Sequence, residues 1–362
     1  MFLISAELEH YIADLTFQNY HMLFVSTESI SKIKLNKWAE FVLKQKNANI
    51  FQTLQMYEIY KNTLNYKPIF FSVTNERNEI LGVLLSVVQK EHKGILGKFS
   101  SRSIIWGGPL IKNNNLEVLD FILKEYSKTI RNKAIYTQFR NIWEWNEQEK
   151  EIFAKNGFKF KKHLDIIHDL TIHPDKQFMK MNQGRRKNIR RSIKQEVGFE
   201  EIKTKTELLE SLSLIKETYK KVKLPLPDES LFISVFNQLF HQKLVRFFKA
   251  TYQEKLIAVR FVFCYKDLIY DWFAGSSEDH LNKYPNDFLP WKVMEWGHHN
   301  GYKKFDFGGA GKPNEKYGVR DYKLKFGGEL VEFGRFEQVH KPILMHIGKK
   351  GLKIYKLIKH VR

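Results

Sequence analysis

The chain has 362 residues, 43% of them hydrophobic and 14% aromatic, and a single cysteine, Cys264. This composition excludes a disordered protein, the lone cysteine excludes a disulfide framework, and the length suits two domains. The formal net charge is +20. Such an excess of lysine and arginine either attracts a polyanionic partner (RNA, a phosphate-linked substrate, an anionic membrane surface) or only keeps the protein soluble.

The ends of the sequence predict neither a signal peptide nor a membrane span. Residues 1–15 contain acidic side chains and no basic stretch before an apolar core. No run of about 18 apolar residues occurs anywhere. We therefore expect a cytoplasmic protein. The basic, amphipathic residues 349–362 leave two interpretations open: peripheral contact with the inner face of the cytoplasmic membrane, or docking on the protein itself.

The predicted elements follow one order twice. The first half predicts helices at 35–47 and 51–66, strands within 67–91 and 103–111, a helix at 116–133, a strand at 134–141, a helix at 147–158 and a strand at 161–172. The second half predicts helices at 206–222 and 226–240, three strands within 244–275, a helix at 290–302 and a strand at 303–309. Consecutive strands flanked by helices predict a mixed α/β protein of the α+β class, with mostly antiparallel sheets. Two similar halves favour a ligand cleft between them.

Residues 305–328, FDFGGAGKPNEKYGVRDYKLKFGG, are rich in glycine but do not form a nucleotide-binding motif. A Walker loop needs Ser or Thr after its Gly-Lys pair, and here proline follows it. Alternation in DYKLKFGG predicts a strand that places Lys323 and Lys325 on one face. The neighbouring glycines would let the backbone approach a ligand closely.

The most basic segment is Lys176–Lys194, KQFMKMNQGRRKNIRRSIK, which has eight basic residues and no acid. Ile189 and Ile193 are one helical turn apart and predict a helix anchored on its apolar side. A phosphate-rich ligand would then contact its arginines, or the charged face is simply solvated. The arginines concerned are Arg185, Arg186, Arg190 and Arg191.

Several catalytic patterns are absent from the sequence. It has no G-x-S-x-G, no H-E-x-x-H and no Cys-x-x-Cys motif. His298 and His299 are adjacent, so on a helix their rings diverge and make a poor metal-binding pair. We expect no metal and no bound cofactor.

Four stretches together carry a family resemblance. WAEFVLKQKNANIFQTLQMYEIYK contains F-Q-[ST] between two helices, and FAKNGFKFKKHLDIIHDLTI contains "GF, then D-L". GRRKNIRRSIKQEVGFE contains R-x-x-I-R-[RK]-[AS], and FDFGGAG…GVRDYKLKFGGELVEFG contains D-[FL]-G-G, then [FY]-K and F-G-G. In this order they resemble the Fem family of peptidoglycan aminoacyltransferases and their FemAB-like relatives, which share the GNAT acyltransferase fold.

The resemblance implies two GNAT-like domains, residues 1–165 completed by the tail 334–362, and residues 166–333. It implies an acceptor groove on the first domain and a donor channel in the second. By its motifs, Lys323, Tyr322 and Asp306 would lie at the catalytic site. Lys61 would bind acceptor phosphate. Asp306 has a second interpretation, a cap on the following glycine turn, and the alternative for Lys323 is a surface lysine without a role in the site.

The sequence also departs from the family pattern. Pro227 and Leu231 stand where the Fem enzymes place an arginine and a tyrosine that grip the pentapeptide, and Phe273 replaces a tyrosine in the substrate site. A polar acceptor would lose roughly 1–3 kcal/mol for each partner left unpaired. The identity of the acceptor therefore stays open.

The predicted function is transfer of an aminoacyl group from aminoacyl-tRNA to an amine of a nucleotide- or lipid-linked cell-envelope precursor. The ester of the donor is already activated, so the enzyme must align the amine and stabilise an oxyanion. The alternative is an acyl-CoA-dependent N-acyltransferase acting on amino sugars of surface polysaccharide. A third interpretation is an RNA- or membrane-binding protein on a decayed transferase fold.

Overall fold

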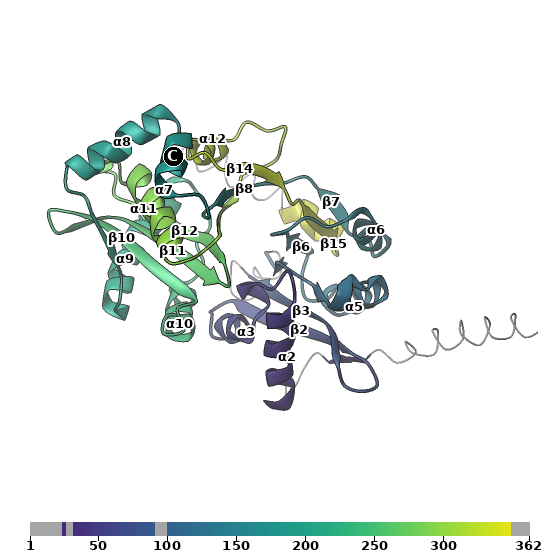
Figure 1. Ribbon diagram of the computed structural model, residues 1–362. Helices are drawn as coiled ribbons and strands as arrows, with labels where there is room; N and C mark the ends of the chain where they lie inside the picture. The colour runs from purple at the N-terminus through teal and green to yellow at the C-terminus, as the bar shows by residue number, and fades with distance from the viewer. Residues whose placement is uncertain (1–23, 27–31, 91–99, 349–362) are drawn as a thin grey trace, which may run out of the picture.

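The computed structural model describes residues 24–26, 32–90 and 100–348 (Figure 1). Its strands form two separate sheets, and helices pack on both. The expectations about residues 1–15 and 349–362 lie outside the described residues. No helix in the described ranges has both the length and the apolar character needed to cross a membrane.

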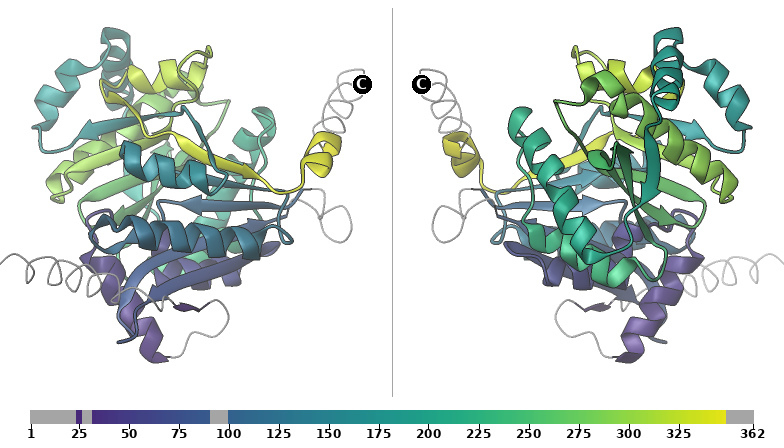
Figure 2. Two further views of the ribbon diagram at one scale, coloured as in Figure 1. Left: turned by 90° about the vertical axis from the view of Figure 1, so that its right-hand side faces the viewer. Right: turned by 90° about the vertical axis from the view of Figure 1, so that its left-hand side faces the viewer.

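The first sheet has the order β1-β2-β3-β4-β6-β15-β7, with β5 paired to β3. Strands β4 and β6 are parallel, and their neighbours are antiparallel. Strand β15 joins this sheet from near the end of the chain (Figure 2). Its strands are β1 Phe24–Ser26, β2 Tyr66–Thr74, β3 Ile80–Gln89, β4 Arg102–Trp106, β5 Leu110–Ile111, β6 Tyr136–Arg140, β7 Lys159–Lys161 and β15 Arg335–Val339.

The second sheet has the order β14-β8-β13-β12-β11-β10-β9. Strands β12 and β13 are parallel, and the other pairs are antiparallel. Its strands are β8 Leu164–Asp169, β9 Gly198–Glu201, β10 Val245–Tyr252, β11 Lys255–Tyr265, β12 Leu268–Ser276, β13 Lys304–Gly309 and β14 Glu329–Glu332. Each described sheet thus contains one parallel pair. The division of the chain into domains at residue 165 stays a prediction.

Helices α2, α3, α5 and α6 pack on the first sheet or on each other, and α9 and α11 pack on the second. Local sequence explains where several begin: α6 and α9 start with capping boxes, and Asn115 caps α5. The helices are α2 Lys32–Lys44, α3 Leu54–Lys61, α5 Leu116–Ile130, α6 Glu147–Lys155, α7 Pro174–Lys180, α8 Gln183–Lys194, α9 Lys205–Lys221, α10 Glu229–Leu239, α11 Pro285–His299 and α12 Gly318–Leu324, and residues 342–348 are also helical.

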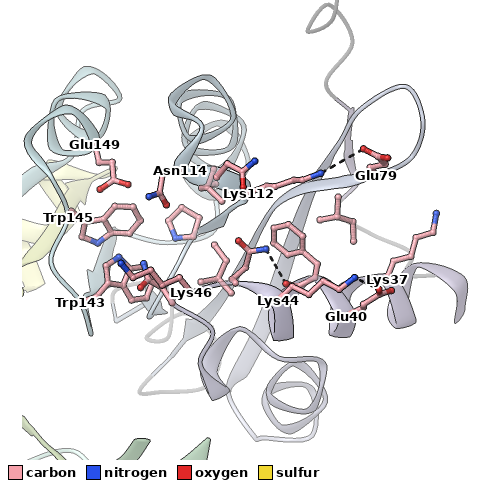
Figure 3. Close-up of a pocket in the computed structure, with 18 of the residues that line it drawn as sticks. Lys37, Glu40, Lys44, Lys46, Glu79, Lys112, Asn114, Trp143, Trp145 and Glu149 are labelled. Carbon is pink, nitrogen blue, oxygen red and sulfur yellow. Dashed lines mark hydrogen bonds and ion pairs between the residues drawn. The ribbon is translucent and has the colours of Figure 1, made fainter. Parts of the chain in front are cut away.

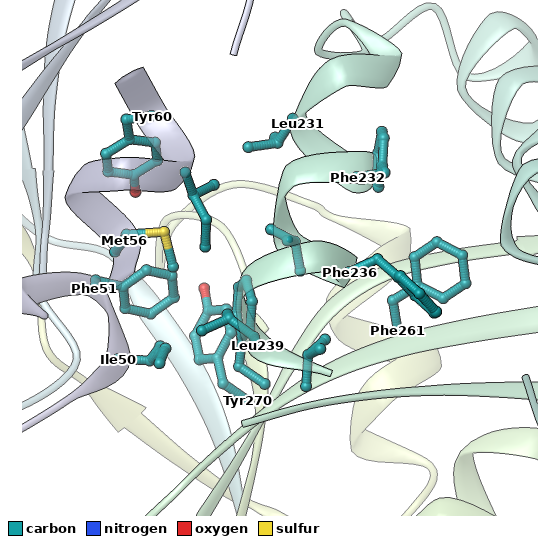
Figure 4. Packing of buried hydrophobic residues seen from close by; sticks show 14 of the residues in the cluster. Ile50, Phe51, Met56, Tyr60, Leu231, Phe232, Phe236, Leu239, Phe261 and Tyr270 are labelled. Carbon is teal, nitrogen blue, oxygen red and sulfur yellow. The ribbon is translucent and has the colours of Figure 1, made fainter. Parts of the chain in front are cut away.

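One hydrophobic core joins the two halves of the molecule. Helix α3 packs against α10, and Phe51 meets Tyr270 and Phe263 of the second sheet edge-on, at 5.1 and 5.6 Å between ring centroids (Figure 4). The same cluster contains Leu231, which is 5% exposed. Leu231 thus packs in the shared core, although the resemblance aligns it with a substrate-gripping tyrosine.

The predicted fold class is confirmed, because both sheets are mixed and flanked by helices. Helix α11 begins five residues earlier than predicted, since Pro285 occupies its first position, where a missing N–H does no harm. The prediction of a strand at DYKLKFGG is wrong: residues Gly318–Leu324 form helix α12.

Candidate functional site

Strands β12 and β13 part in the middle of the second sheet. Their parallel pairing runs from Leu268 opposite Lys304 to Tyr270 opposite Asp306. Beyond this point β12 stays paired with β11 through a bulge, while β13 follows β8. The carbonyls of β13 that follow Asp306 are therefore turned toward a gap between two parallel strands.

Lys323 of α12 reaches these carbonyls. Its Nζ donates to the carbonyl oxygen of Phe307 at 2.5 Å and to that of Gly309 at 3.0 Å. Burial lowers the pKa of Lys323, and the carboxylates of Asp271 and Asp306 oppose that shift. Lys323 is thus a half-buried cation held in the gap, which excludes its interpretation as a plain surface lysine.

The helical conformation of α12 changes which lysines share a face. Tyr322 and Phe326, four residues apart, pack together at 5.5 Å between ring centroids and both lie near Phe307. That spacing suits a helix and not a strand. Lys325 follows the helix and is exposed, so it does not accompany Lys323.

Asp306 is 2% exposed, and its Oδ1 accepts a hydrogen bond from the backbone N–H of Gly308 at 2.7 Å. Gly308 has φ +74°, so the carboxylate caps a left-handed glycine turn. Burial raises the pKa of Asp306 to about 6. The capping interpretation therefore describes its contacts, and its buried carboxyl is not open to a substrate.

Asp165 of β8 is a site residue that no sequence motif indicates. Its Oδ1 lies 3.9 Å from the place that a Cβ on Gly309 would take, and Nη2 of Arg335 lies 3.7 Å from the same place. Burial first, and the neighbouring Asp306 second, raise the pKa of Asp165 to about 8. The carboxyl is 14% exposed, so it can exchange a proton near neutral pH.

Charged side chains surround this pair on several sides. Arg260 of β11 pairs with Asp271 of β12 at 2.6 Å, and both are largely buried. Burial lowers the pKa of His163, beside Asp165, to about 4, so this ring is neutral at pH 7. We call Asp165, Asp306, Asp271, Lys323, Arg260 and Arg335 the junction cluster.

The ring of Tyr322 packs near Phe307, beside the junction cluster. Its hydroxyl donates to the backbone oxygen of Asn286 at 2.6 Å, and the Arg185 guanidinium stacks on its ring at 4.7 Å. Arg185 also forms a buried ion pair with Asp287. Arg185 therefore anchors α8 to α11 and α12, which removes it from the predicted phosphate-binding face.

The other arginines of α8 divide into two groups. Arg186 donates to the sulfur of Met179 at 3.2 Å, so it too has a protein partner. Arg190 and Arg191 are exposed, the second bonded to the Tyr284 hydroxyl at 3.0 Å just before α11. With Lys187 and Lys194 they line an open hollow of about 600 Å³.

The apolar anchor of α8 differs from the prediction. Ile189 is buried, but Ile193 is 53% exposed, and Ser192 is the buried residue of that turn. The Ser192 hydroxyl donates to the backbone oxygen of Lys283 at 2.7 Å. A hydrogen bond to the loop before α11 thus replaces the second apolar contact.

Lys61 and Phe273 do not join the junction cluster by any contact among the described residues. Lys61 is exposed at the end of α3 and lies 3.7 Å from Glu58. Phe273 packs against the rings of Phe232 and Trp272, at 4.9 and 4.7 Å between centroids. Their roles in substrate binding stay predictions.

No metal site is built into the described ranges, since no group of three or more His, Cys, Asp or Glu side chains there could hold an ion.

Known proteins share this fold. Residues 183–324 match the family model described as an acetyltransferase (GNAT) domain. The structure of FemX is similar over 89% of this chain and 100% of its own, with a TM-score of 0.68 and 15% identity. The structure of L-PGS from Bacillus licheniformis is similar over 88% of this chain and 96% of its own, with a TM-score of 0.55 and 15% identity.

A tandem GNAT protein from the clavulanic acid biosynthesis pathway is similar over 89% of this chain and 99% of its own, with a TM-score of 0.56 and 8% identity. No curated protein matches the sequence. The predicted Fem-like and GNAT resemblance is confirmed at the level of fold. The chain shares the fold of FemX, and its residues 183–324 match a GNAT acetyltransferase domain.

Proposed function

We propose that the protein transfers an aminoacyl group from aminoacyl-tRNA to an amine of a cell-envelope precursor. One observation carries the proposal: the Lys323 ammonium group lies in the gap where the parallel strands β12 and β13 part. A fixed cation in a partly dehydrated gap stabilises negative charge on an acyl oxygen better than water does.

The reaction needs a nucleophile, a proton acceptor and an oxyanion partner. The acceptor amine bonds to the acyl carbon, the tetrahedral oxyanion forms beside Lys323, and the ester bond to the ribose oxygen breaks. Asp165 takes the proton from the amine and returns it to the leaving oxygen. Its raised pKa suits this exchange, because a base works best when its pKa lies near the working pH.

Two features favour aminoacyl-tRNA over acyl-CoA as the donor. The Lys323 ammonium group already occupies one acceptor position on each of the carbonyls of Phe307 and Gly309, so the amide N–H groups of a pantetheine arm would compete with it there. The exposed cations of α8 lie beside Tyr284, at the start of α11, and offer a surface for RNA phosphates. The proposed acceptor is an amine on a nucleotide- or lipid-linked precursor.

The test uses labelled amino acid charged on tRNA and, in parallel, labelled acetyl-CoA, each with a membrane and nucleotide-linked precursor fraction. We expect label from charged tRNA in the precursor fraction. Label from acetyl-CoA alone would establish the acyl-CoA alternative, and turnover with neither donor would favour the non-enzymatic interpretation.

A further inference from the structure

A cavity of about 720 Å³ lies beside the first sheet, apart from the junction cluster (Figure 3). Helix α2, the turn before β3, the loop after β5 and the loop that leads into α6 form its walls. None of its lining residues belongs to the junction cluster. The cavity is therefore separate from the proposed site of acyl transfer.

The position of the cavity favours a ligand site. Among the lining residues, Pro109 lies in the turn after β4, and Trp143 and Trp145 lie in the loop after β6. Strands β4 and β6 form the parallel pair of the first sheet. In open sheets, ligands bind in the crevice outside the carboxyl ends of parallel strands. The second sheet has its own parallel pair, where Lys323 lies, so the two halves of the fold offer equivalent places.

Two tryptophans form the apolar part of the wall. The rings of Trp143 and Trp145 lie 5.2 Å apart with a tilt of 41°, and Trp143 is partly exposed. The indole Nε1 of Trp145 is buried and has no acceptor among the described residues. Indole rings stack on the C–H face of a sugar ring, and a sugar hydroxyl can accept from an indole N–H.

The polar part of the wall combines amides, cations and the carboxylates of Glu40, Glu79 and Glu149. Asn113 and Asn114 are exposed, and amides donate to and accept from hydroxyl groups at once. Lys44 is paired with Glu40 at 2.5 Å, Lys112 lies 4.0 Å from Glu79, and Glu149 belongs to the capping box of α6. Lys37 donates to the backbone oxygen of Asn78, whereas Lys46 forms no ion pair within the described ranges. Lys46 is thus the cation best placed to meet an anionic group of a ligand.

We propose that this cavity binds a saccharide that carries an anionic group, either a phosphate or a carboxylate. Trp143 stacks on the sugar ring, the asparagine amides bond its hydroxyls, and Lys46 binds the anion. The proposal goes beyond acyl transfer and does not depend on it, because binding can be measured without turnover.

Calorimetric titration of the intact protein with glucose 1-phosphate, glucuronate, glucose and inorganic phosphate tests the proposal. We expect binding of at least one anionic sugar, with weaker binding of glucose and of inorganic phosphate. Trp143→Leu and Lys46→Met should each raise the Kd about tenfold, which corresponds to one favourable interaction. The comparison of phosphate with carboxylate identifies the anion.

Lys133→Met is the matched control, since Lys133 is an exposed cation that lines neither this cavity nor the basic face of α8. An effect of Lys133→Met as large as that of Lys46→Met would overturn the proposal, and so would equal binding of inorganic phosphate and sugar phosphate. Lack of binding by all four probes would also overturn it. Lys46 is exposed, so its variant should fold even if Trp143→Leu does not.

Discussion

Asp165 and Asp306 lie together at the junction cluster, but their contacts give them different tasks. Asp306 is buried and already accepts from the Gly308 N–H, whereas Asp165 is partly exposed and lies within reach of Arg335 and Lys323. Two carboxyl groups at close range do not ionise together readily. Asp165 is therefore the carboxyl that can exchange a proton with a substrate.

Asp165→Asn should lower kcat about 10²-fold or more while leaving the fold intact. The wild-type rate should rise with pH through about 8, the raised pKa of Asp165, and the variant should lose that rise. A pH–rate profile of both proteins checks this. An unchanged profile in the variant would remove Asp165 from the mechanism.

The same pKa predicts how stability depends on pH. Because the folded pKa of Asp165 lies above its ordinary value, its contribution is fully present below about pH 4 and is lost as pH rises through about 8. Asp165→Asn should therefore raise Tm more at pH 9 than at pH 5. Thermal unfolding at both pH values measures the difference, and an equal change at both would contradict the raised pKa.

Helix α8 shows how far a charged segment can be interpreted from sequence. The number of cations predicts a basic helix, and it is one, but Arg185 is held by Asp287, about a hundred positions away in sequence. The segment Y-K-L-K-F fits both the two-residue period of a strand and the period of a helix, so the sequence alone predicts a strand at α12. The packing of Tyr322 and Phe326 on Phe307 shows that the segment is a helix. Asp165 has no sequence signal, since its partners come from β13 and β15.

The elements that begin with strong caps and continue in amphipathic runs can be predicted within a few residues, as α5, α6 and α9 show. Their signals are local, so sequence alone contains them. The junction cluster depends on contacts between distant strands, which a single sequence does not reveal.

Removing the exposed cations of α8 should weaken tRNA binding. Arg190→Gln, Lys187→Gln and Lys194→Gln together should lower affinity and flatten the slope of log K against log salt by about 0.7–0.9 for each phosphate that is no longer neutralised. Filter binding at several salt concentrations measures the slope. Arg185 is left unchanged because its removal would break a buried ion pair. If the slope of log K against log salt did not change, the basic face of α8 would be only a solvated surface.

At the scale of the whole molecule, the shared core joins the two sheets into one unit. Phe51 meets rings of the second sheet, and α3 packs on α10. The gap beside Lys323 is therefore held in a constant place relative to the first sheet. If a flexible linker alone joined the halves, the position of this gap relative to the first sheet would vary.

Phe51→Ala should destabilise the protein by about 3–5 kcal/mol, because it empties a packed site between the halves. Unfolding in denaturant should nevertheless remain a single transition in the wild type. Leu43→Ala is the control, since Leu43 is 60% exposed and should change stability by under about 0.5 kcal/mol. Two separate wild-type transitions would show that the halves unfold independently.

The central claim is that Lys323 stabilises the transition state of acyl transfer in the gap between β12 and β13. Its most direct test is single-turnover transfer of labelled amino acid from charged tRNA by Lys323→Met, with Lys325→Met as control. Lys323→Met leaves two carbonyls without a donor, so Tm is measured alongside. We predict a fall in the rate of about 10²-fold or more for Lys323→Met and almost none for the exposed Lys325→Met. Equal rates for the two folded variants would contradict the account.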